Sequence, residues 1–302
     1  VYSVAFSFDS KMIASGSMWD TVKIWDSTTG KRIRTLSSNR VGQILSVAFS
    51  NDSKRLISGT RYYFNDTWDL RTGKCLNSFG SSGGQLCVAI SPDSRLVASG
   101  LTNNTIKIWT TTDTGNKCLR TLQGHDRSVQ SVAFSHDCRF IASGSYDATI
   151  KIWEVETGDC LQTLEGHSQG VSSVVFSHDS KMLASGGADK TVNIWGVLTG
   201  SFQTLQGHRD GVTSVAFSDD ARMLASGSSD STIRLWDVTN GNCLQVLEGH
   251  CDGVLSVAFS HDSTRLASGS SDGTLKIWDI SILLTMLSPS GVNSPTAPLR
   301  SF

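Results

Sequence analysis

The chain has 302 residues, of which 38% are hydrophobic and 18% are charged, and its formal net charge is −1. This composition is typical of a globular protein rather than a disordered one. The nearly balanced charge argues against nucleic acid or an anionic membrane as a partner, and no apolar run approaches the roughly 18 residues that a membrane-spanning helix needs.

One tryptophan recurs along the chain at an almost constant interval. The successive spacings are 43, 41, 44, 42, 41 and 42 residues, for Trp25, Trp68, Trp109, Trp153, Trp195, Trp236 and Trp278. A segment of the type "VAFS" precedes each tryptophan, at 4–7, 47–50, 88–91, 132–135, 174–177, 215–218 and 257–260. Self-similarity at such a period indicates a repeat array in which each copy is one structural unit.

Each repeat predicts four short strands separated by turns. In the copy that surrounds Trp153, the strands expected are "SVAFS" (131–135), "IASGS" (141–145), "TIKIW" (149–153) and "CLQTL" (160–164). The turns between them are "HDCRF" (136–140), "YDA" (146–148) and "ETGD" (156–159). The third strand alternates with period two, so one face should be buried. No segment has a helical period of useful length, and we expect an all-β fold.

The repeats resemble the WD40 family over residues 1 to about 287. Trp-Asp is intact at 25–26, 68–69, 236–237 and 278–279, and Gly-His at 124–125, 166–167, 207–208 and 249–250. The resemblance implies one seven-bladed β-propeller with four antiparallel strands per blade. The expected blades are 1–36, 37–79, 80–122, 123–164, 165–205, 206–247 and 248–287, and the Ser/Pro-rich residues 288–302 predict a disordered tail.

The resemblance also implies a structural role for the four Gly-His histidines. In the family, a His, a Ser, an Asp and the repeat Trp of one blade form a hydrogen-bonded chain, which suits their donors and acceptors. Carried over by position, the four sets are His125–Ser143–Asp147–Trp153, His167–Ser185–Asp189–Trp195, His208–Ser226–Asp230–Trp236 and His250–Ser268–Asp272–Trp278. We expect these side chains to stabilise the fold rather than to carry chemistry.

The remaining histidines, His136, His178 and His261, stand in turns of three separate repeats, so we do not expect a shared metal site. The sequence contains no nucleophile elbow, no phosphate-binding loop and no paired-carboxylate motif. We therefore expect no catalytic residue, no metal and no cofactor. A propeller enzyme would place catalytic groups at blade-specific positions that the repeat does not reveal, and this alternative stays open.

Seven cysteines raise the question of disulfides. Four of them occupy the same place in successive repeats and should lie in different blades, too far apart to pair: Cys75, Cys118, Cys160 and Cys243. No Cys-x-x-Cys motif suggests zinc or redox chemistry. We expect small buried thiols in a reducing, cytoplasmic compartment.

Residues that differ among otherwise similar blades are candidates for contact with a partner. The resemblance places two variable positions on the narrow top face, one before each "SVAFS" and one before each tetrad Asp. Blades 5 and 6 carry only small residues there, whereas blades 7, 1, 2, 3 and 4 carry Leu255, Tyr2, Met18, Leu45, Arg61, Leu86 and Tyr146. Aromatic, Met and Arg side chains are favoured in interface cores. This arc predicts a partner-binding face; the alternative is that it only covers the channel mouth.

The second repeat departs furthest from the pattern. Tyr62 stands at the tetrad Asp position, Asn65-Asp66-Thr67 replaces the apolar third strand, and Ser38-Asn39 replaces Gly-His. Milder departures in blades 1 and 3 are Trp19 and Asn103 at the Asp position and Ser81-Ser82 in place of Gly-His. Blade 2 should therefore be the first blade to open locally.

The same repeat carries an aromatic and basic tip made of Arg61, Tyr62, Tyr63 and Phe64. This tip is a second candidate contact for a partner. The alternative is simple decay of one copy in a redundant array.

The last blade needs an outer strand. Within this sequence, "ILLTML" (282–287) is the only segment placed to supply it. The alternative, which we favour, is that the strand and its Gly-His precede Val1, so that the sequence is part of a longer chain.

These features favour a noncatalytic scaffold or adaptor that binds protein or peptide partners on the top face, as a monomeric ring or within a larger complex. The near-identity of blades 4 to 7 is similar to the WD-repeat arrays of fungal NACHT and NB-ARC signalling proteins, which implies the sensor end of a larger protein. Alternatives are a free-standing adaptor, similar to mitochondrial-fission adaptors, or a ubiquitin-ligase substrate receptor. A small-ligand-binding or enzymatic propeller would instead use the central channel.

Overall fold

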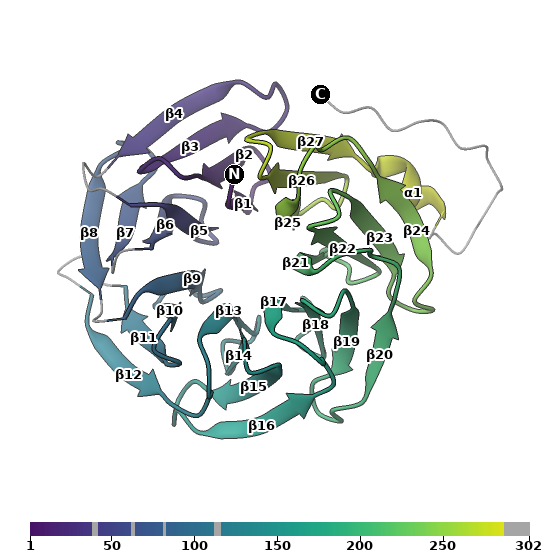
Figure 1. Ribbon diagram of the computed structural model, residues 1–302. Helices are drawn as coiled ribbons and strands as arrows, with labels where there is room; N and C mark the ends of the chain where they lie inside the picture. The colour runs from purple at the N-terminus through teal and green to yellow at the C-terminus, as the bar shows by residue number, and fades with distance from the viewer. Residues whose placement is uncertain (38–41, 62–63, 81–82, 112–115, 287–302) are drawn as a thin grey trace.

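A computed structural model describes residues 1–37, 42–61, 64–80, 83–111 and 116–286, and these form a closed ring of seven blades (Figure 1). The predicted WD-repeat propeller is confirmed. In the described residues, six blades are four-stranded antiparallel sheets whose strands run in chain order from the centre to the rim, and blade 7 has three strands. The expected tail, residues 288–302, lies outside the described residues.

The strands of the first four blades begin and end as follows. Blade 1 contains β1 Ser3–Phe6, β2 Met12–Gly16, β3 Thr21–Asp26 and β4 Arg32–Ser37, and blade 2 contains β5 Ile44–Phe49, β6 Arg55–Thr60, β7 Phe64–Asp69 and β8 Cys75–Gly80. Blade 3 contains β9 Gln85–Ile90, β10 Leu96–Leu101, β11 Ile106–Thr110 and β12 Cys118–Leu122, and blade 4 contains β13 Val129–Phe134, β14 Phe140–Ser145, β15 Thr149–Glu154 and β16 Cys160–Glu165.

The remaining strands complete the ring. Blade 5 contains β17 Val171–Phe176, β18 Met182–Gly187, β19 Val192–Gly196 and β20 Phe202–Leu205, and blade 6 contains β21 Val212–Phe217, β22 Met223–Ser228, β23 Ile233–Asp237 and β24 Cys243–Leu247. Blade 7 contains β25 Val254–Phe259, β26 Arg265–Ser270 and β27 Leu275–Asp279, followed by the helix α1 Ser281–Met286.

Burial within each blade explains why the sequence pattern changes from strand to strand. Strand β14 lies between two strands and between two blades, and all its residues after Phe140 are buried. Strand β16 at the rim buries only Leu164 of its six residues. The apolar second strand and the largely polar fourth strand of each repeat therefore reflect their distance from the centre of the ring.

Adjacent blades pack closely because the glycine that ends the "ASG" motif leaves room for the next inner strand. A Cβ added to Gly186 would lie 2.5 Å from Cγ1 of Val212 in the following blade. The backbone N–H of Val215 also donates to the hydroxyl of Ser173 in the preceding blade, at 3.1 Å. The same bond joins Val4 to Ser256 at 3.0 Å, so blade 7 contacts blade 1 through their inner strands and closes the ring.

The structure of residues 281–286 differs from two expectations. Residues 281–286 form a helix, although we expected no helix and considered 282–287 as the outer strand of blade 7. The carboxylate of Asp279 accepts the backbone N–H of Ser281 at 3.0 Å, which stabilises the first turn. Ile280 and Leu283 then pack into the core beside Trp278, so burial on one side of a helical turn replaces strand pairing.

The burial of the cysteines also differs from expectation. All seven thiols are free, but Cys75, Cys160 and Cys243 are exposed and Cys118 is partly exposed. The first residue of each outer strand points away from the ring, so its burial is low. Only Cys87 is buried among the seven, and burial raises the pKa of its thiol to about 12.

Candidate partner-binding site

The four sets of His, Ser, Asp and Trp form hydrogen-bonded chains in blades 4 to 7. In blade 4, His125 contacts the Asp147 carboxylate through Nδ1 at 2.7 Å and the Ser143 hydroxyl through Nε2 at 2.7 Å. The Trp153 indole N–H donates to the same hydroxyl at 2.8 Å. The equivalent bonds in blades 5, 6 and 7 are 2.7–3.1 Å long.

The environment of these groups suits a structural role. Burial lowers the pKa of His125, against the opposing effect of the Asp147 carboxylate. Burial alone would raise the pKa of Asp147, but hydrogen bonds from Thr149 and His125 lower it to about 2. The order Asp–His–Ser resembles that of a hydrolytic triad. However, Ser143 is fully buried and its hydroxyl accepts the indole N–H of Trp153, so a substrate cannot reach it.

Blades 1 to 3 keep only part of this arrangement. The repeat Trp still donates to the Ser hydroxyl, at 2.8 Å in blade 1 and at 2.9 Å in blades 2 and 3. At the Asp position, Trp19 is 76% exposed and Asn103 accepts the hydroxyl of Thr105 at 2.7 Å. Tyr62, Ser38-Asn39 and Ser81-Ser82 lie outside the described residues.

The third strand of blade 2 buries three polar side chains, Asn65, Asp66 and Thr67, each 4% exposed or less. Asn65 accepts a hydrogen bond from the side-chain amide of Gln85, and Asp66 accepts one from Ser78. Asp66 Oδ2 and Thr67 Oγ1 have no hydrogen-bond partner within the described residues. Blade 2 therefore carries buried polar atoms that the other third strands largely replace with apolar ones.

The turn histidines are neighbours although they come from separate blades. The rings of His136 and His178 lie 4.3 Å apart, and Nδ1 of His261 lies 3.0 Å from a carboxylate oxygen of Asp219. The same oxygen lies 3.6 Å from Nδ1 of His178. Burial and the nearby His178 lower the pKa of His136. Among the described residues, no group of three or more His, Cys, Asp or Glu side chains could hold a metal ion.

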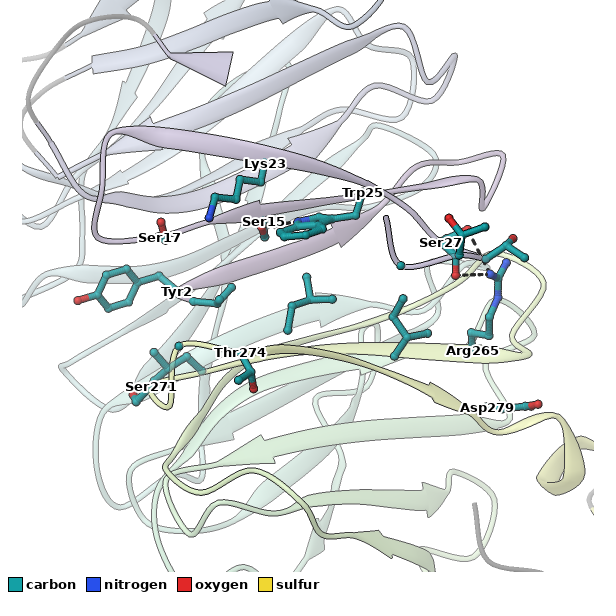
Figure 2. Close-up of a pocket in the computed structure, with 18 of the residues that line it drawn as sticks. Tyr2, Ser15, Ser17, Lys23, Trp25, Ser27, Arg265, Ser271, Thr274 and Asp279 are labelled. Atoms are coloured by element: carbon teal, nitrogen blue, oxygen red, sulfur yellow. Dashed lines mark hydrogen bonds between the residues drawn. The ribbon is translucent and has the colours of Figure 1, made fainter. Parts of the chain in front are cut away.

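A cavity of about 1160 Å³ lies between blades 7 and 1. It extends along the outer edge of β27, and Figure 2 shows Tyr2 and Ser271 at one end, Trp25 in the middle, and Arg265 and Asp279 at the other end. At this far end, Arg265 donates from Nη1 to the backbone carbonyl of Ser27 at 2.8 Å. We call this cavity the 7–1 groove.

Side chains that other blades bury are uncovered in the 7–1 groove. Leu275 and Ile277 of β27 are partly exposed, whereas the corresponding Ile150 and Ile152 of blade 4 are 0% and 3% exposed. Trp25 is also partly exposed, although the other six repeat tryptophans are 6% exposed or less. The groove therefore presents an apolar wall on each side.

The structure brings together three of the seven residues of the predicted top-face arc. Tyr2, Met18 and Leu255 line the 7–1 groove together with Trp19, and Met18 is 53% exposed. Leu45 and Leu86 are partly buried and do not line this groove.

The other residues of the arc and of the blade 2 tip lie elsewhere. Tyr146 is 53% exposed and lines a second cavity of about 630 Å³, shared by blades 4 and 5. Exposed Arg61 donates to the side-chain oxygen of Gln43 at 3.0 Å, and Phe64 is 39% exposed at the start of β7. Tyr62 and Tyr63 lie outside the described residues.

The sequence comparison of blades missed Trp19, Trp25 and Ile277 as lining residues of the groove. The available signal was Trp19, a large aromatic residue in a turn where blades 4 to 7 carry Asp. Trp25 and Ile277 gave no such signal because they match the repeat, and only the arrangement of blades 7 and 1 exposes them.

Two family models match the chain. The model described as "TEP-1 second beta-propeller" matches residues 86–290, and the model described as "WD domain, G-beta repeat" matches residues 1–26 and 30–65. No curated protein matches the chain. Within the described part of the chain, no helix is long and apolar enough to span a membrane.

Proposed function

The chain belongs to the WD-repeat β-propellers, in the family described as the TEP-1 second β-propeller, and we propose that it is a noncatalytic scaffold that binds protein or peptide partners. The observation that carries this proposal is the 7–1 groove, where Met18 and Trp19 are 53% and 76% exposed beside Tyr2 and Leu255. Aromatic and Met side chains of this kind form the cores of protein interfaces.

The surroundings of the groove support binding rather than catalysis. The tetrad hydroxyls of blades 4 to 7 are buried within hydrogen-bonded chains and are not open to a substrate. Trp25, Leu275 and Ile277 of the groove walls lie on β-strands of two packed blades, and Met18 and Trp19 lie in the turn between β2 and β3. A preformed surface loses little conformational entropy when a partner binds.

The proposal extends to the cellular setting. The seven free thiols suit a reducing intracellular compartment. The same groove would serve either a free-standing adaptor or the sensor end of a longer signalling protein. The mass of the native protein, measured by immunoblot, separates the two, since a free-standing chain would run near 32.5 kDa.

The test compares the proteins that co-purify with the wild-type chain and with two double variants. The combination of Met18→Ser and Trp19→Ser removes exposed groove side chains, and the combination of Leu161→Ser and Leu198→Ser removes side chains that are 53% and 90% exposed elsewhere. We expect a partner that the groove variant loses and the control variant keeps. An identical set of partners for all three chains would contradict the proposal.

A further inference from the structure

We propose that the cavity between blades 4 and 5 binds a lysine or arginine side chain of a protein partner. We call this cavity the 4–5 pocket; the residues that line it include Asp126, Arg127, Tyr146, Asp147, Ser168 and Ala188. Among the described residues, none lines both this pocket and the 7–1 groove. The inference goes beyond the proposed function, because it adds a second site and names the chemistry of its ligand.

The aromatic wall of the 4–5 pocket is Tyr146, which lies in the turn between β14 and β15 and is 53% exposed. Its backbone N–H donates to the carbonyl of Ser128 at 3.1 Å. A Cβ added to Gly170 of blade 5 would lie 2.5 Å from Cδ1 of the Tyr146 ring, so a larger residue there would collide with the ring. The backbone of the next blade therefore supports the ring at the wall of the cavity.

The fold does not require a tyrosine at this position. Ala188 in blade 5 and Ser229 in blade 6 occupy the equivalent place. Their Cα atoms would lie 3.4 Å and 3.2 Å from a Cβ added to the following Gly211 and Gly253, so these blades pack in the same way without an aromatic ring. An exposed aromatic side chain that blade packing does not need is available to contact a partner.

Asp147 gives the pocket a negative charge. Burial lowers the pKa of His125, so its ring is neutral near pH 7. Hydrogen bonds from Thr149 and His125 overcome the effect of burial on Asp147 and lower the pKa of this carboxyl to about 2, so the tetrad keeps an uncompensated carboxylate. The oxygens of Asp147 already accept bonds from His125, Thr149 and the backbone of Asp126. Asp147 therefore acts on a ligand through its charge rather than by direct contact.

The carboxylate that a ligand can contact directly is that of Asp126, which is exposed. Among the described residues that line the pocket, exposed Arg127 is the only cation. Two carboxylates against one guanidinium leave an excess of negative charge, which favours a positively charged ligand. The Tyr146 ring also attracts a cation, so the aromatic wall and the carboxylates favour the same kind of ligand.

A protein segment suits the remaining wall of the pocket. A lysine or arginine side chain can cover Tyr146 with its alkyl chain while its charged end reaches Asp126. The cavity, of about 630 Å³, has room for this side chain and for the adjoining backbone. Exposed Ser168 and Gln169 supply a hydroxyl and an amide on the blade 5 side, which can bond that backbone.

The other blades supply substitutions that should leave the fold intact. Asp126→Ser and Arg127→Gln give blade 4 the residues that blade 5 carries there, Ser168 and Gln169. Tyr146→Ser gives blade 4 the residue that blade 6 carries, Ser229. None of the three replaces a tetrad side chain.

The test is an NMR titration of the full chain, labelled with carbon-13 at its alanine methyl groups, with the peptide Ser-Gly-Lys-Gly-Ser. Ala148 and Ala188 line the pocket and report binding there, whereas Ala225, 0% exposed in blade 6, should not shift. We expect saturable shifts of the two pocket methyl groups with this peptide and with its arginine form. Forms with norleucine or glutamate in place of the lysine should bind at least about tenfold more weakly.

The chain variants test the role of each wall. Tyr146→Ser and Asp126→Ser should each weaken binding of the lysine peptide about two- to fivefold. Arg127→Gln should strengthen it, because this change removes a repelling charge. The control Asp210→Gln removes a carboxylate from the corresponding loop of blade 6, outside the pocket, and should change the affinity by less than about twofold at about 0.15 M salt.

Three results would overturn the inference. One is the absence of any shift at Ala148 and Ala188 with the lysine and arginine peptides. Another is a norleucine peptide that binds as well as the lysine peptide, which would mean an apolar site. The third is tighter binding of the glutamate peptide together with weaker binding after Arg127→Gln, which would mean an anion site.

The scaffold proposal and this inference fail separately. The double variant Met18→Ser and Trp19→Ser alters the 7–1 groove and leaves the 4–5 pocket intact, so it should bind the lysine peptide as the wild type does. Loss of the peptide in this variant would place it in the groove and overturn the assignment to the pocket. Tyr146→Ser, in turn, should keep the partner that depends on Met18 and Trp19.

Discussion

The indole N–H of Trp25 donates to the hydroxyl of Ser15 over 2.8 Å, as the repeat Trp does in every other blade. This bond persists in blades 1 to 3, where the structure shows no tetrad His and Asp beside it within the described residues. The Trp–Ser bond is therefore the common element of all seven blades, since a buried indole N–H without a partner is costly. The His–Asp pair is an addition found in blades 4 to 7.

Because of this difference, the same serine-to-alanine substitution should lower the free energy of unfolding by different amounts in blades 4 and 1. Ser143→Ala would leave both the Trp153 indole and the His125 ring without their shared partner, and we expect a loss of about 2–4 kcal/mol in the free energy of unfolding. Ser15→Ala removes a partner only from partly exposed Trp25, so the loss should be about 1 kcal/mol. Denaturant unfolding of the two variants measures both values. Equal losses would mean that the histidine adds nothing to its blade.

The tetrads also predict acid sensitivity in two steps. Burial lowers the folded-state pKa of His125, His167, His208 and His250, so the unfolded chain takes up protons first and stability falls as the pH drops below about 6.5. The pKa values of Asp147 and Asp230 are lowered to about 2, so the stability that these carboxylates contribute is lost as the pH falls from about 4 toward 2.

Unfolding measured between about pH 7 and pH 5 tests the first step. The His208→Gln variant should show a smaller decrease in stability over this range than the wild type, because one of the groups that takes up a proton on unfolding is absent. A steeper decrease in the variant would contradict the direction assigned to the histidine pKa.

Two leucines of the outer strand β16 should contribute very differently to the free energy of unfolding. Leu164 is 4% exposed and packs in the core shared with blade 5, so Leu164→Ala should cost about 2–5 kcal/mol. Leu161 of β16 is 53% exposed, and Leu161→Ala should change the free energy of unfolding by less than about 0.5 kcal/mol. Comparable losses in the free energy of unfolding at both positions would show that the outer strand does not stabilise the packing of adjacent blades.

A single substitution in blade 2, at Thr67, should stabilise the protein. Thr67 Oγ1 is buried without a hydrogen-bond partner in the described residues, so Thr67→Val removes an unsatisfied polar atom at nearly constant volume and should stabilise the protein by about 1 kcal/mol. In the wild type, backbone amides of β7 should exchange with solvent faster than those of β15. Slower exchange in β7 would contradict the view that blade 2 opens first.

The repeat made much of the fold predictable. The tryptophan spacing predicts seven blades because each copy of about 40 residues can bury its apolar strands only against neighbouring copies. The exposure of Cys160 and Cys243 was harder to predict, since the first residue of an outer strand faces solvent while its neighbours in sequence resemble core residues. The helix at 281–286 depends on the packing of Ile280 and Leu283, which a short apolar run does not distinguish from a strand.

The candidate site was less predictable because it depends on contacts between residues that are distant in sequence. Trp25 and Ile277 match the repeat and look like core residues, but they become walls of a groove where the first and last blades meet. His136 and His178 lie 4.3 Å apart for a similar reason, because equivalent turns of adjacent blades follow one another around the ring. Comparison of blades predicted Tyr2, Met18 and Leu255 as candidate contacts because their positions vary from blade to blade, and all three line the groove.

The most direct test of the proposed scaffold is oxidative footprinting of the full chain, alone and in complex with the partner that depends on Met18 and Trp19. These two side chains are 53% and 76% exposed, and the complex should protect both. Leu198, 90% exposed and away from the groove, should be oxidised equally in the free and bound chain. Protection of Leu198 with unchanged oxidation of Met18 and Trp19 would contradict the assignment of the 7–1 groove as the partner-binding surface.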